Sequence, residues 1–109
     1  MATIQLINNK TITAIDTPEI LYTAPENENV VIESFTAANV SGVNASYKAY
    51  VVSADGDDVP QIPFKIIVWG NNDLGIGIVN QVIPANGYLK MECSALESIY
   101  FTVSGRTVS

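Results

Sequence analysis

Residues 98–104 read Ser-Ile-Tyr-Phe-Thr-Val-Ser, and residues 88–93 read Tyr-Leu-Lys-Met-Glu-Cys. In both segments apolar side chains alternate with the others one by one. A period of two is typical of a strand with one buried face, so both segments are predicted to be half-buried antiparallel strands. Residues 94–97 between them are short enough for a tight connection. The two strands would then present Tyr88 and Tyr100 as cross-strand neighbours on one outward face.

Further segments carry strand signals, and Gly, Pro and Asn residues separate them. They are residues 3–7, 11–15, 20–23, 30–38, 45–53, 64–69 and 79–83. About eight short strands favour one all-β domain over residues 1–109, an antiparallel β-sandwich with jelly-roll connections as one arrangement. Four prolines are expected outside the strand centres, where a missing N–H does least harm: Pro25, Pro60, Pro63 and Pro84.

Residues 1–15 are predicted to form either an extended N-terminal arm or a hairpin. Asn8 and Asn9 separate the first two strand segments, and Asn tolerates the positive φ of a hairpin turn. As an arm, residues 1–7 could add a strand to a neighbouring molecule.

One predicted strand is apolar on both faces, with Phe64, Ile66 and Val68 on one face and Ile67 and Trp69 on the other. Such a strand needs cover on both sides. A loop or another subunit could supply the second cover, and the sequence leaves both open. Ile67 and Trp69 are therefore candidate residues of a subunit contact.

Charged residues make up 15% of the chain, against about 25% in an average soluble domain. Because charge keeps a small domain soluble and monomeric, this deficit favours self-assembly over a monomer with a polar, uncharged surface. The net charge is -6 and the five basic residues are scattered, which argues against binding to nucleic acid or an anionic membrane. One cysteine and the absence of a signal-peptide pattern are compatible with a reducing cytosol.

The sequence offers little catalytic chemistry. It contains no histidine, the commonest general base and metal ligand. Cys93 falls on the inward side of its strand, so it is predicted to be an inert core thiol. The glycine-rich residues 70–77 lack the following helix or Lys of a phosphate-binding loop, and are predicted to be a flexible loop.

Two groups of carboxylates remain as candidates for acid–base work. They are Glu26 with Glu28, and Asp55 with Asp57 and Asp58. Both groups fall in predicted loops, where solvated side chains are the expectation. The second group resembles the start of a calcium loop, but the twelfth position is Ile66 instead of Glu. We therefore predict no enzyme, no cofactor and no metal site, and a weak calcium site built from two loops stays open.

Five aromatic residues are candidates for contact with a ligand or partner: Tyr47, Tyr50, Trp69, Tyr88 and Tyr100. They could form a platform for stacking sugars, a protein interface, or ordinary sheet surface, because Tyr is both a good strand former and a frequent interface residue. Tyr88 and Tyr100 are the candidate interface residues on an exposed sheet face.

Three segments resemble a group of small bacteriophage virion proteins. The first is Ile-Leu-Tyr-Thr-Ala-Pro at residues 20–25 with Asn-Val-Val-Ile-Glu-Ser-Phe-Thr-Ala-Ala-Asn at residues 29–39. The others are Val-Ile-Pro-Ala-Asn-Gly-Tyr-Leu at residues 82–89 and Ser-Ile-Tyr-Phe-Thr-Val-Ser-Gly at residues 98–105. The group usually has Pro-Ala-Gly where this chain inserts Asn86, and residues 54–80 have no counterpart in the group's pattern.

The resemblance implies a β-sandwich structural protein of the virion, assembled in the host cytoplasm. Some members of the group decorate or cement capsids, often as trimers, and others belong to tails or baseplates. The leading expectation is a homo-oligomeric capsid decoration protein that binds the major capsid protein or another virion protein. The alternative is a tail or baseplate accessory module that binds a host glycan. A third hypothesis, a small hydrolase using the carboxylates of residues 55–58, has no substrate to support it.

Overall fold

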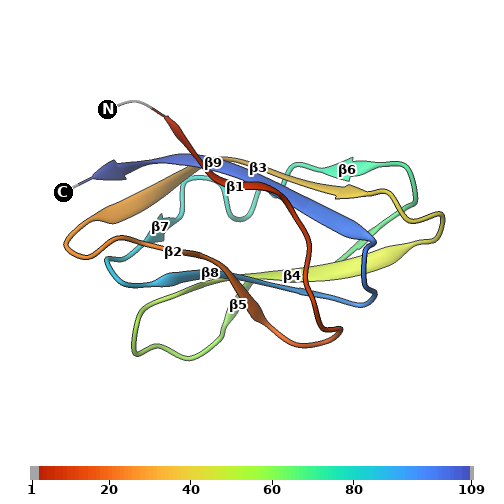
Figure 1. Cartoon of the computed structure of the whole chain (residues 1–109), viewed down its shortest axis with the longest axis horizontal. Helices are drawn as coiled ribbons and strands as arrows, with labels where there is room; N and C mark the ends of the chain where they lie inside the picture. The colour runs from red at the N-terminus through yellow and green to blue at the C-terminus, as the bar shows by residue number, and fades with distance from the viewer. Residues whose placement is uncertain (1–2, 109) are drawn as a thin grey trace.

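The computed structural model describes residues 3–108, which form nine strands and no helix (Figure 1). The strands are β1 (Ile4–Lys10), β2 (Glu19–Thr23), β3 (Asn29–Asn39), β4 (Ala45–Val52), β5 (Pro60–Ile67), β6 (Asn72–Asp73), β7 (Val82–Ile83), β8 (Tyr88–Cys93) and β9 (Ile99–Val108). They lie in two antiparallel sheets that pack face to face. The prediction of an all-β antiparallel sandwich is therefore confirmed.

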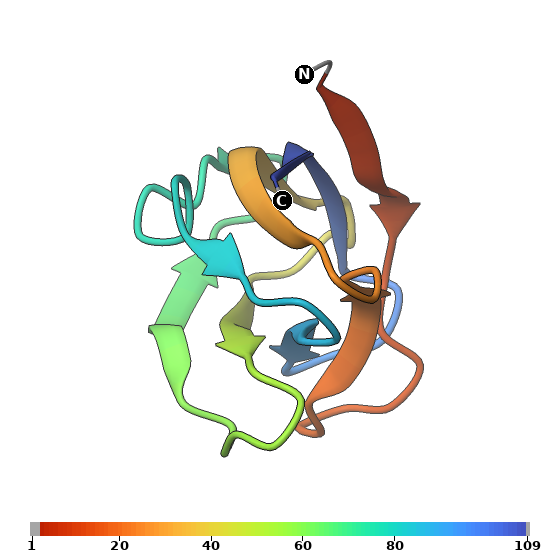
Figure 2. The same ribbon diagram turned by 90° about the vertical axis from the view of Figure 1, so that its left-hand side faces the viewer.

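The strand order is that of a jelly roll. The first sheet runs β1-β9-β3-β6, with β7 also paired to β3, and the second runs β2-β8-β4-β5. Figure 2 shows the two sheets as an upper and a lower layer. Among the described strands, β4 and β5 are the one consecutive pair joined by hydrogen bonds. Because β6 and β7 both pair with β3, the fold is an eight-stranded jelly roll whose sixth strand is interrupted.

The core lies between the sheets, and β9 shows how the sequence builds it. Ile99, Phe101 and Val103 are fully buried, as their alternation predicts. The rings of Phe35, Tyr47 and Phe101, which come from both sheets, meet with centroid separations of 5.5 to 6.0 Å. Removing one large apolar side chain from water contributes about 1.5–3 kcal/mol to stability, so these rings hold the layers together.

Apolar residues of β3 do not alternate regularly along the sequence, and a β-bulge explains why. Between Ile32 and Ser34 its pairing with β9 gains one extra residue, Glu33. A bulge shifts the side-chain register by one. The inward-facing residues of β3 therefore have even numbers before the bulge and odd numbers after it. On β9, Gly105 faces Ile32 beside the bulge. The strands are tightly packed there, because a Cβ on Gly105 would lie 2.2 Å from the carbonyl oxygen of Val31.

The N-terminal segment is neither a free arm nor a hairpin, so that prediction is wrong. β1 runs through Asn8 and Asn9 and pairs with β9 of the same chain. Asn9 does have a positive φ of 51°, but its conformation accommodates a bulge between Ile7 and Lys10 in place of a hairpin turn. The predicted strand at residues 11–15 is instead part of the loop that crosses to β2. Met1 and Ala2 lie outside the described residues.

β8 and β9 are strands as predicted, but they belong to different sheets. Residues 94–98 cross between the layers, so Tyr88 and Tyr100 are not cross-strand neighbours. Pro60 is the first residue of β5, as expected, but Pro63 lies inside the strand, against expectation. β5 is an edge strand with two register shifts, and such positions tolerate a missing N–H.

Candidate interaction surfaces

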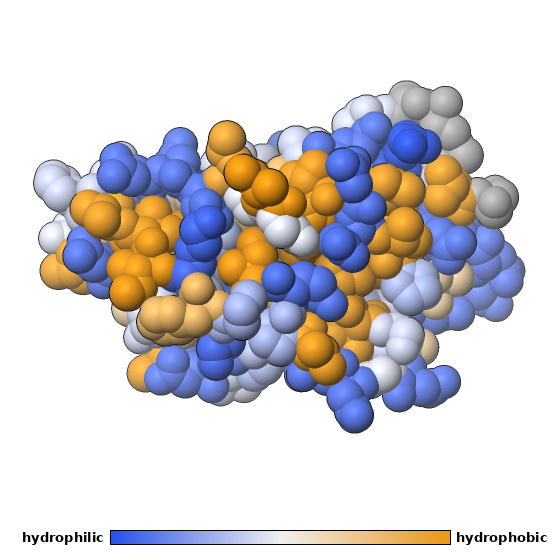
Figure 3. Space-filling model, turned by 180° about the vertical axis from the view of Figure 1, so that it is seen from behind, coloured by the Kyte–Doolittle hydropathy of each residue, from blue (hydrophilic) through white to orange (hydrophobic). Residues whose placement is uncertain are grey.

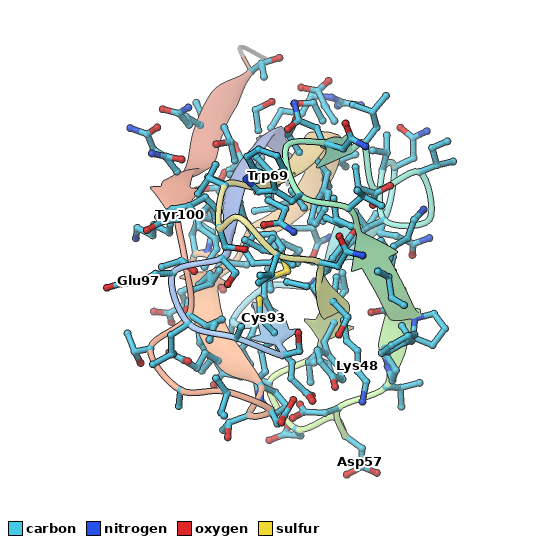
Figure 4. The ribbon with its side chains drawn as sticks, turned by 90° about the vertical axis from the view of Figure 1, so that its right-hand side faces the viewer. Lys48, Asp57, Trp69, Cys93, Glu97 and Tyr100 are labelled. Atoms are coloured by element: carbon cyan, nitrogen blue, oxygen red, sulfur yellow. The ribbon has the colours of Figure 1, made fainter. Side chains whose placement is uncertain are left out.

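Three loops at one end of the sandwich carry exposed apolar side chains. The loops are residues 40–44, 68–71 and 94–98, which join β3 to β4, β5 to β6 and β8 to β9. We call the large apolar residues that are at least half exposed there the apolar end: Val40, Val43, Val68, Trp69 and Leu96. Figure 4 looks onto these loops and shows Trp69 toward the middle and Glu97 at the margin.

The buried side chain of Asn39 orders the loops of the apolar end through hydrogen bonds. This side chain is 2% exposed, and its amide nitrogen donates hydrogen bonds to the carbonyl oxygens of Val43 and Ile67, each at 2.8 Å. Its amide oxygen accepts hydrogen bonds from the backbone N–H and the hydroxyl of Ser41. Asn39 was not among the residues predicted from the sequence. A polar residue at the last inward position of a long strand is the signal that could have identified it.

Hydrogen bonds donated by backbone N–H groups place the loop of residues 68–71 beside the loop of residues 40–44. The N–H of Trp69 donates to the amide oxygen of Asn44 at 3.2 Å, and the N–H of Gly70 donates to the carbonyl of Asn39 at 3.0 Å. The N–H of Val40 donates to the carbonyl of Ser98 at 2.9 Å, which ties in the third loop. The exposed side chains are therefore presented by a hydrogen-bonded loop cluster.

A second apolar surface runs along the edge formed by β5 and the loop from β6 to β7. We call it the apolar edge, and its members are Phe64, Ile66, Leu74 and Ile76. Figure 3 looks onto this side and shows apolar patches separated by hydrophilic side chains. A shallow hollow of about 230 Å³ lies beside Phe64 and Ile66, lined also by residues of β4 and by Ser94.

The loop of Ile76 is anchored on both sides. Ile76 is 83% exposed, whereas Ile78 is completely buried. Gly75 has a φ of +58°, and a Cβ there would lie 2.1 Å from the ring of Phe35. The N–H of Ile78 donates to the carbonyl of Gly75 at 2.9 Å. This packing shows that residues 74–78 are a tight turn that holds Ile76 outward. The predicted loop at residues 70–77 thus contains the short strand β6 and the start of this turn.

The structure separates the two residues predicted for a subunit contact. Trp69 is 58% exposed, in keeping with a contact, but Ile67 is 4% exposed and faces the core. Ile67 pairs with Ala45, another core residue, so its side chain cannot serve an interface. The outward face of β5 is formed by Phe64 and Ile66 instead.

A polar clasp links the sheets beneath the apolar edge. Asp73 of β6 accepts a hydrogen bond from the phenol of buried Tyr47 on β4 and lies 3.0 Å from the ammonium of Lys65 on β5. The N–H of Gly75 also donates to Asp73, at 3.2 Å. Burial alone raises the pKa of Asp73, but the hydrogen bonds from Tyr47 and Lys65 outweigh it and hold that pKa below its ordinary value. Burial and this carboxylate raise the pKa of Tyr47.

Ion pairs cover the outer face of the second sheet. The ammonium of Lys90 lies 3.0 Å from Asp58 and 5.7 Å from the ring centre of Tyr88. Glu92 accepts a hydrogen bond from Tyr50 at 2.6 Å and lies 3.6 Å from Lys48. This face is therefore charged but locally neutralised, with Tyr88 and Tyr50 committed to neighbours in the same chain.

Trp69, Tyr88 and Tyr100 lie on three different surfaces. Tyr88 lies on the outer face of the second sheet, half-buried Tyr100 lies on β9 of the first sheet, and Trp69 lies in an end loop. Tyr47 and Tyr50 are buried. A sugar platform needs several rings on one face, and the structure does not bring these residues together.

The opposite end of the sandwich is acidic. Its loops, residues 24–28, 53–59 and 84–87, lie together because Gly87 accepts a hydrogen bond from the N–H of Ala24 and packs against the carbonyl of Val52. They contain five carboxylates and no basic residue: Glu26, Glu28, Asp55, Asp57 and Asp58. Asp58 is the one that forms an ion pair within the described residues.

Cys93 and the two groups of loop carboxylates were the candidates for catalysis or metal binding. Cys93 is 1% exposed, and burial raises its thiol pKa to about 12, so the thiolate that nucleophilic attack requires is scarce. Within residues 3–108, no group of three or more Cys, Asp or Glu side chains is placed to hold a metal ion.

Comparison of the chain with protein-family models, with curated proteins and with solved structures gives no match. In the part of the chain that the structure describes, there is no helix with the length and hydropathy needed to cross a membrane.

Proposed function

We propose that the protein is a non-catalytic structural protein of a bacteriophage virion that binds the capsid exterior and stabilises it. The observation that carries the proposal is the exposure of nine large apolar side chains, each at least half exposed, over the apolar end and the apolar edge. Exposed apolar surface of this extent on a small domain marks an interaction site. The low charge content of the chain agrees with such a role.

The resemblance of three segments to small phage virion proteins supports the virion part of the proposal. A jelly roll is an architecture of viral capsid domains and also of lectins, so the fold alone does not assign the function. The separation of Trp69, Tyr88 and Tyr100 over three surfaces favours a protein partner over a glycan.

In this proposal the apolar edge packs against the major capsid protein or another virion protein. Burial contributes about 25 cal/mol per Å² of apolar surface, less the cost of association. The anchored turn at residues 74–78 lowers that cost, because Ile76 is already held outward before binding. Many copies on one particle would then act together through avidity.

The test uses virions purified from a host that produces the phage encoding this chain, together with particles prepared without the protein. Purified protein is added back, and co-sedimentation with heads and with separated tails is measured. The wild type should sediment with heads, and Phe64→Asp and Ile76→Asp should lose most of this binding. The matched control is Val59→Asp, a substitution of another exposed apolar residue, here in an acidic-end loop, which should bind normally. Absence of the chain from virions, or recovery with tails alone, would contradict the proposal.

A further inference from the structure

The sandwich has opposite chemical character at its two ends. The apolar end and the acidic end lie at opposite extremes of its long axis, along which the molecule extends 41 Å (Figure 1). Glu97 is the sole charged residue in the three loops of the apolar end. Four carboxylates without an ion pair among the described residues, Glu26, Glu28, Asp55 and Asp57, are therefore gathered at the far end. Two carboxylates lie toward the apolar end: Glu97, and Asp16 of the loop from β1 to β2, whose N–H donates to the carbonyl of Cys93.

We infer that two copies of this chain associate end to end, as a two-fold dimer whose contact is the apolar end. The occupant of this surface is thus a second copy of the protein. The inference goes beyond the proposed function, because it concerns self-association and leaves the apolar edge free for the virion partner.

Charge determines which arrangement of two copies is favourable. Each copy carries a net charge of -6, so association must keep the free carboxylates apart. In an end-to-end pair the acidic ends are separated by roughly 80 Å, twice the 41 Å extent, which is many times the Debye length of about 8–10 Å. Packing side by side or head to tail would bring an acidic end close to the other copy.

The apolar end also meets the requirement of a self-complementary surface. A two-fold contact places the same patch of both copies face to face, so charges at its centre would repel each other. Trp69 and its valine neighbours are uncharged, and Glu97 lies at the margin. An aromatic centre with a polar rim is the usual composition of an interface.

The available area fits a modest dimer. Five side chains at least half exposed offer on the order of 100 Å² each, roughly 500 Å² in total, and polar loop atoms add to it; a standard interface buries about 800 Å² per partner. The Asn39 hydrogen bonds already order the loops, so little conformational entropy is lost on contact. A single second copy, placed face to face, is large enough to cover the whole apolar end. This favours a dimer over the trimer that the resemblance implies.

Trp69 supplies a specific reporter, because it is the only tryptophan in the chain. Light scattering after size-exclusion chromatography should give a mass rising from 11.7 kDa to twice that value over a range of roughly 10 µM to 1 mM. Over the same range the Trp69 emission should shift to shorter wavelength and become several-fold less quenched by acrylamide. Raising NaCl from about 50 mM to about 500 mM should change the dimer fraction little, since the acidic ends are far apart.

Matched variants locate the contact. Val43→Asp and Leu96→Asp place a charge on the apolar end and should leave the protein monomeric with an unchanged circular dichroism spectrum. Ile76→Asp places the same charge on the apolar edge and should dimerise like the wild type, although it loses virion binding under the proposed function. A monomer at every concentration, a mass of three copies, or loss of association in Ile76→Asp but not in Val43→Asp would overturn the inference.

Discussion

Asp73 and Tyr47 join the two sheets by a hydrogen bond in which the buried phenol donates to the carboxylate. The second oxygen of Asp73 lies 3.0 Å from the ammonium of Lys65. One carboxylate from β6 thus satisfies a buried hydroxyl of β4 and an edge cation of β5. The clasp lies directly beneath the apolar edge, so we expect it to control the stability of that edge.

Removing the carboxylate should cost more than removing the cation. Asp73→Ala leaves the buried Tyr47 hydroxyl without its acceptor, and an unsatisfied buried group costs about 1–3 kcal/mol. Lys65 is partly exposed, with 46% of its side chain accessible, and an exposed ion pair contributes about 1 kcal/mol or less. Urea unfolding of Asp73→Ala, Lys65→Met and Tyr47→Phe measures the three losses. Equal losses for Asp73→Ala and Lys65→Met would refute the central role of the phenol–carboxylate bond.

The same bond predicts how stability depends on pH. The pKa of Asp73 is below its ordinary value because of its hydrogen bonds, so its contribution is present above the unfolded pKa of about 3.9 and is lost as pH falls through the folded pKa. The pKa of Tyr47 is raised by burial and by Asp73, so its contribution is present below about pH 10 and is lost above it.

Unfolding free energies measured from pH 2 to pH 11 check both limits. We expect Asp73→Asn to flatten the loss of stability below pH 4, and Tyr47→Phe to flatten the loss above pH 10. Neither substitution should alter the profile between pH 6 and pH 8, where both groups keep one protonation state. If Asp73→Asn loses as much unfolding free energy below pH 4 as the wild type does, Asp73 is not the source of that loss.

The sequence predicted the strands best where alternation is regular and local. β8 was located to the residue and the start of β9 to within one residue, because one buried face fixes a period of two, although β9 continues four residues beyond its predicted end. Their pairing could not be predicted, since a five-residue link can close a hairpin or cross between layers. The bulges at Asn9 and Glu33 also escaped prediction, because a bulge is selected by the register of a distant partner strand.

The candidate interface was predicted only in part. Trp69 is exposed as expected. On β5, however, Ile67 was predicted to lie at a subunit contact and is buried, whereas Phe64 is exposed. A strand that is apolar on both faces gives no local sign of which face is inward. Ile76 was missed for a similar reason, because its exposure depends on how Gly75 packs against Phe35, a contact between residues forty positions apart.

The turn that holds Ile76 predicts that stability and binding can be separated. Gly75→Ala should destabilise the protein by roughly 1–3 kcal/mol, because φ is +58° and the new Cβ would meet the ring of Phe35 at 2.1 Å. Ile76→Ser, the next residue along, should change stability by less than about 0.5 kcal/mol because its side chain is exposed. Thermal melts of both variants, set beside their co-sedimentation with virions, make the comparison. The reverse order of the two melting temperatures would be incompatible with this account of the turn.

Asn39 offers the last prediction, which connects the interior to the apolar end. Asn39→Ala leaves the carbonyls of Val43 and Ile67 without their side-chain donor, and we expect a loss of about 2–3 kcal/mol, because both acceptors lie in or beside the buried layer. Asn39→Asp should be at least as harmful at pH 7, because a carboxylate accepts hydrogen bonds but cannot donate to those carbonyls. Ser41→Ala is the comparison, since it leaves both amide donations of Asn39 intact and removes the hydroxyl bonds to the Asn39 amide oxygen and to the backbone of Val43. Hydrogen exchange of residues 40–44 and acrylamide quenching of Trp69 should both rise in Asn39→Ala. In Ser41→Ala the quenching should stay near wild type, and exchange should rise at Val43 alone, whose N–H donates to the Ser41 hydroxyl. Unchanged hydrogen exchange of residues 40–44 in Asn39→Ala would mean that backbone hydrogen bonds alone order the loops. The Asn39 side chain would then not be what preorganises the apolar end for dimerisation.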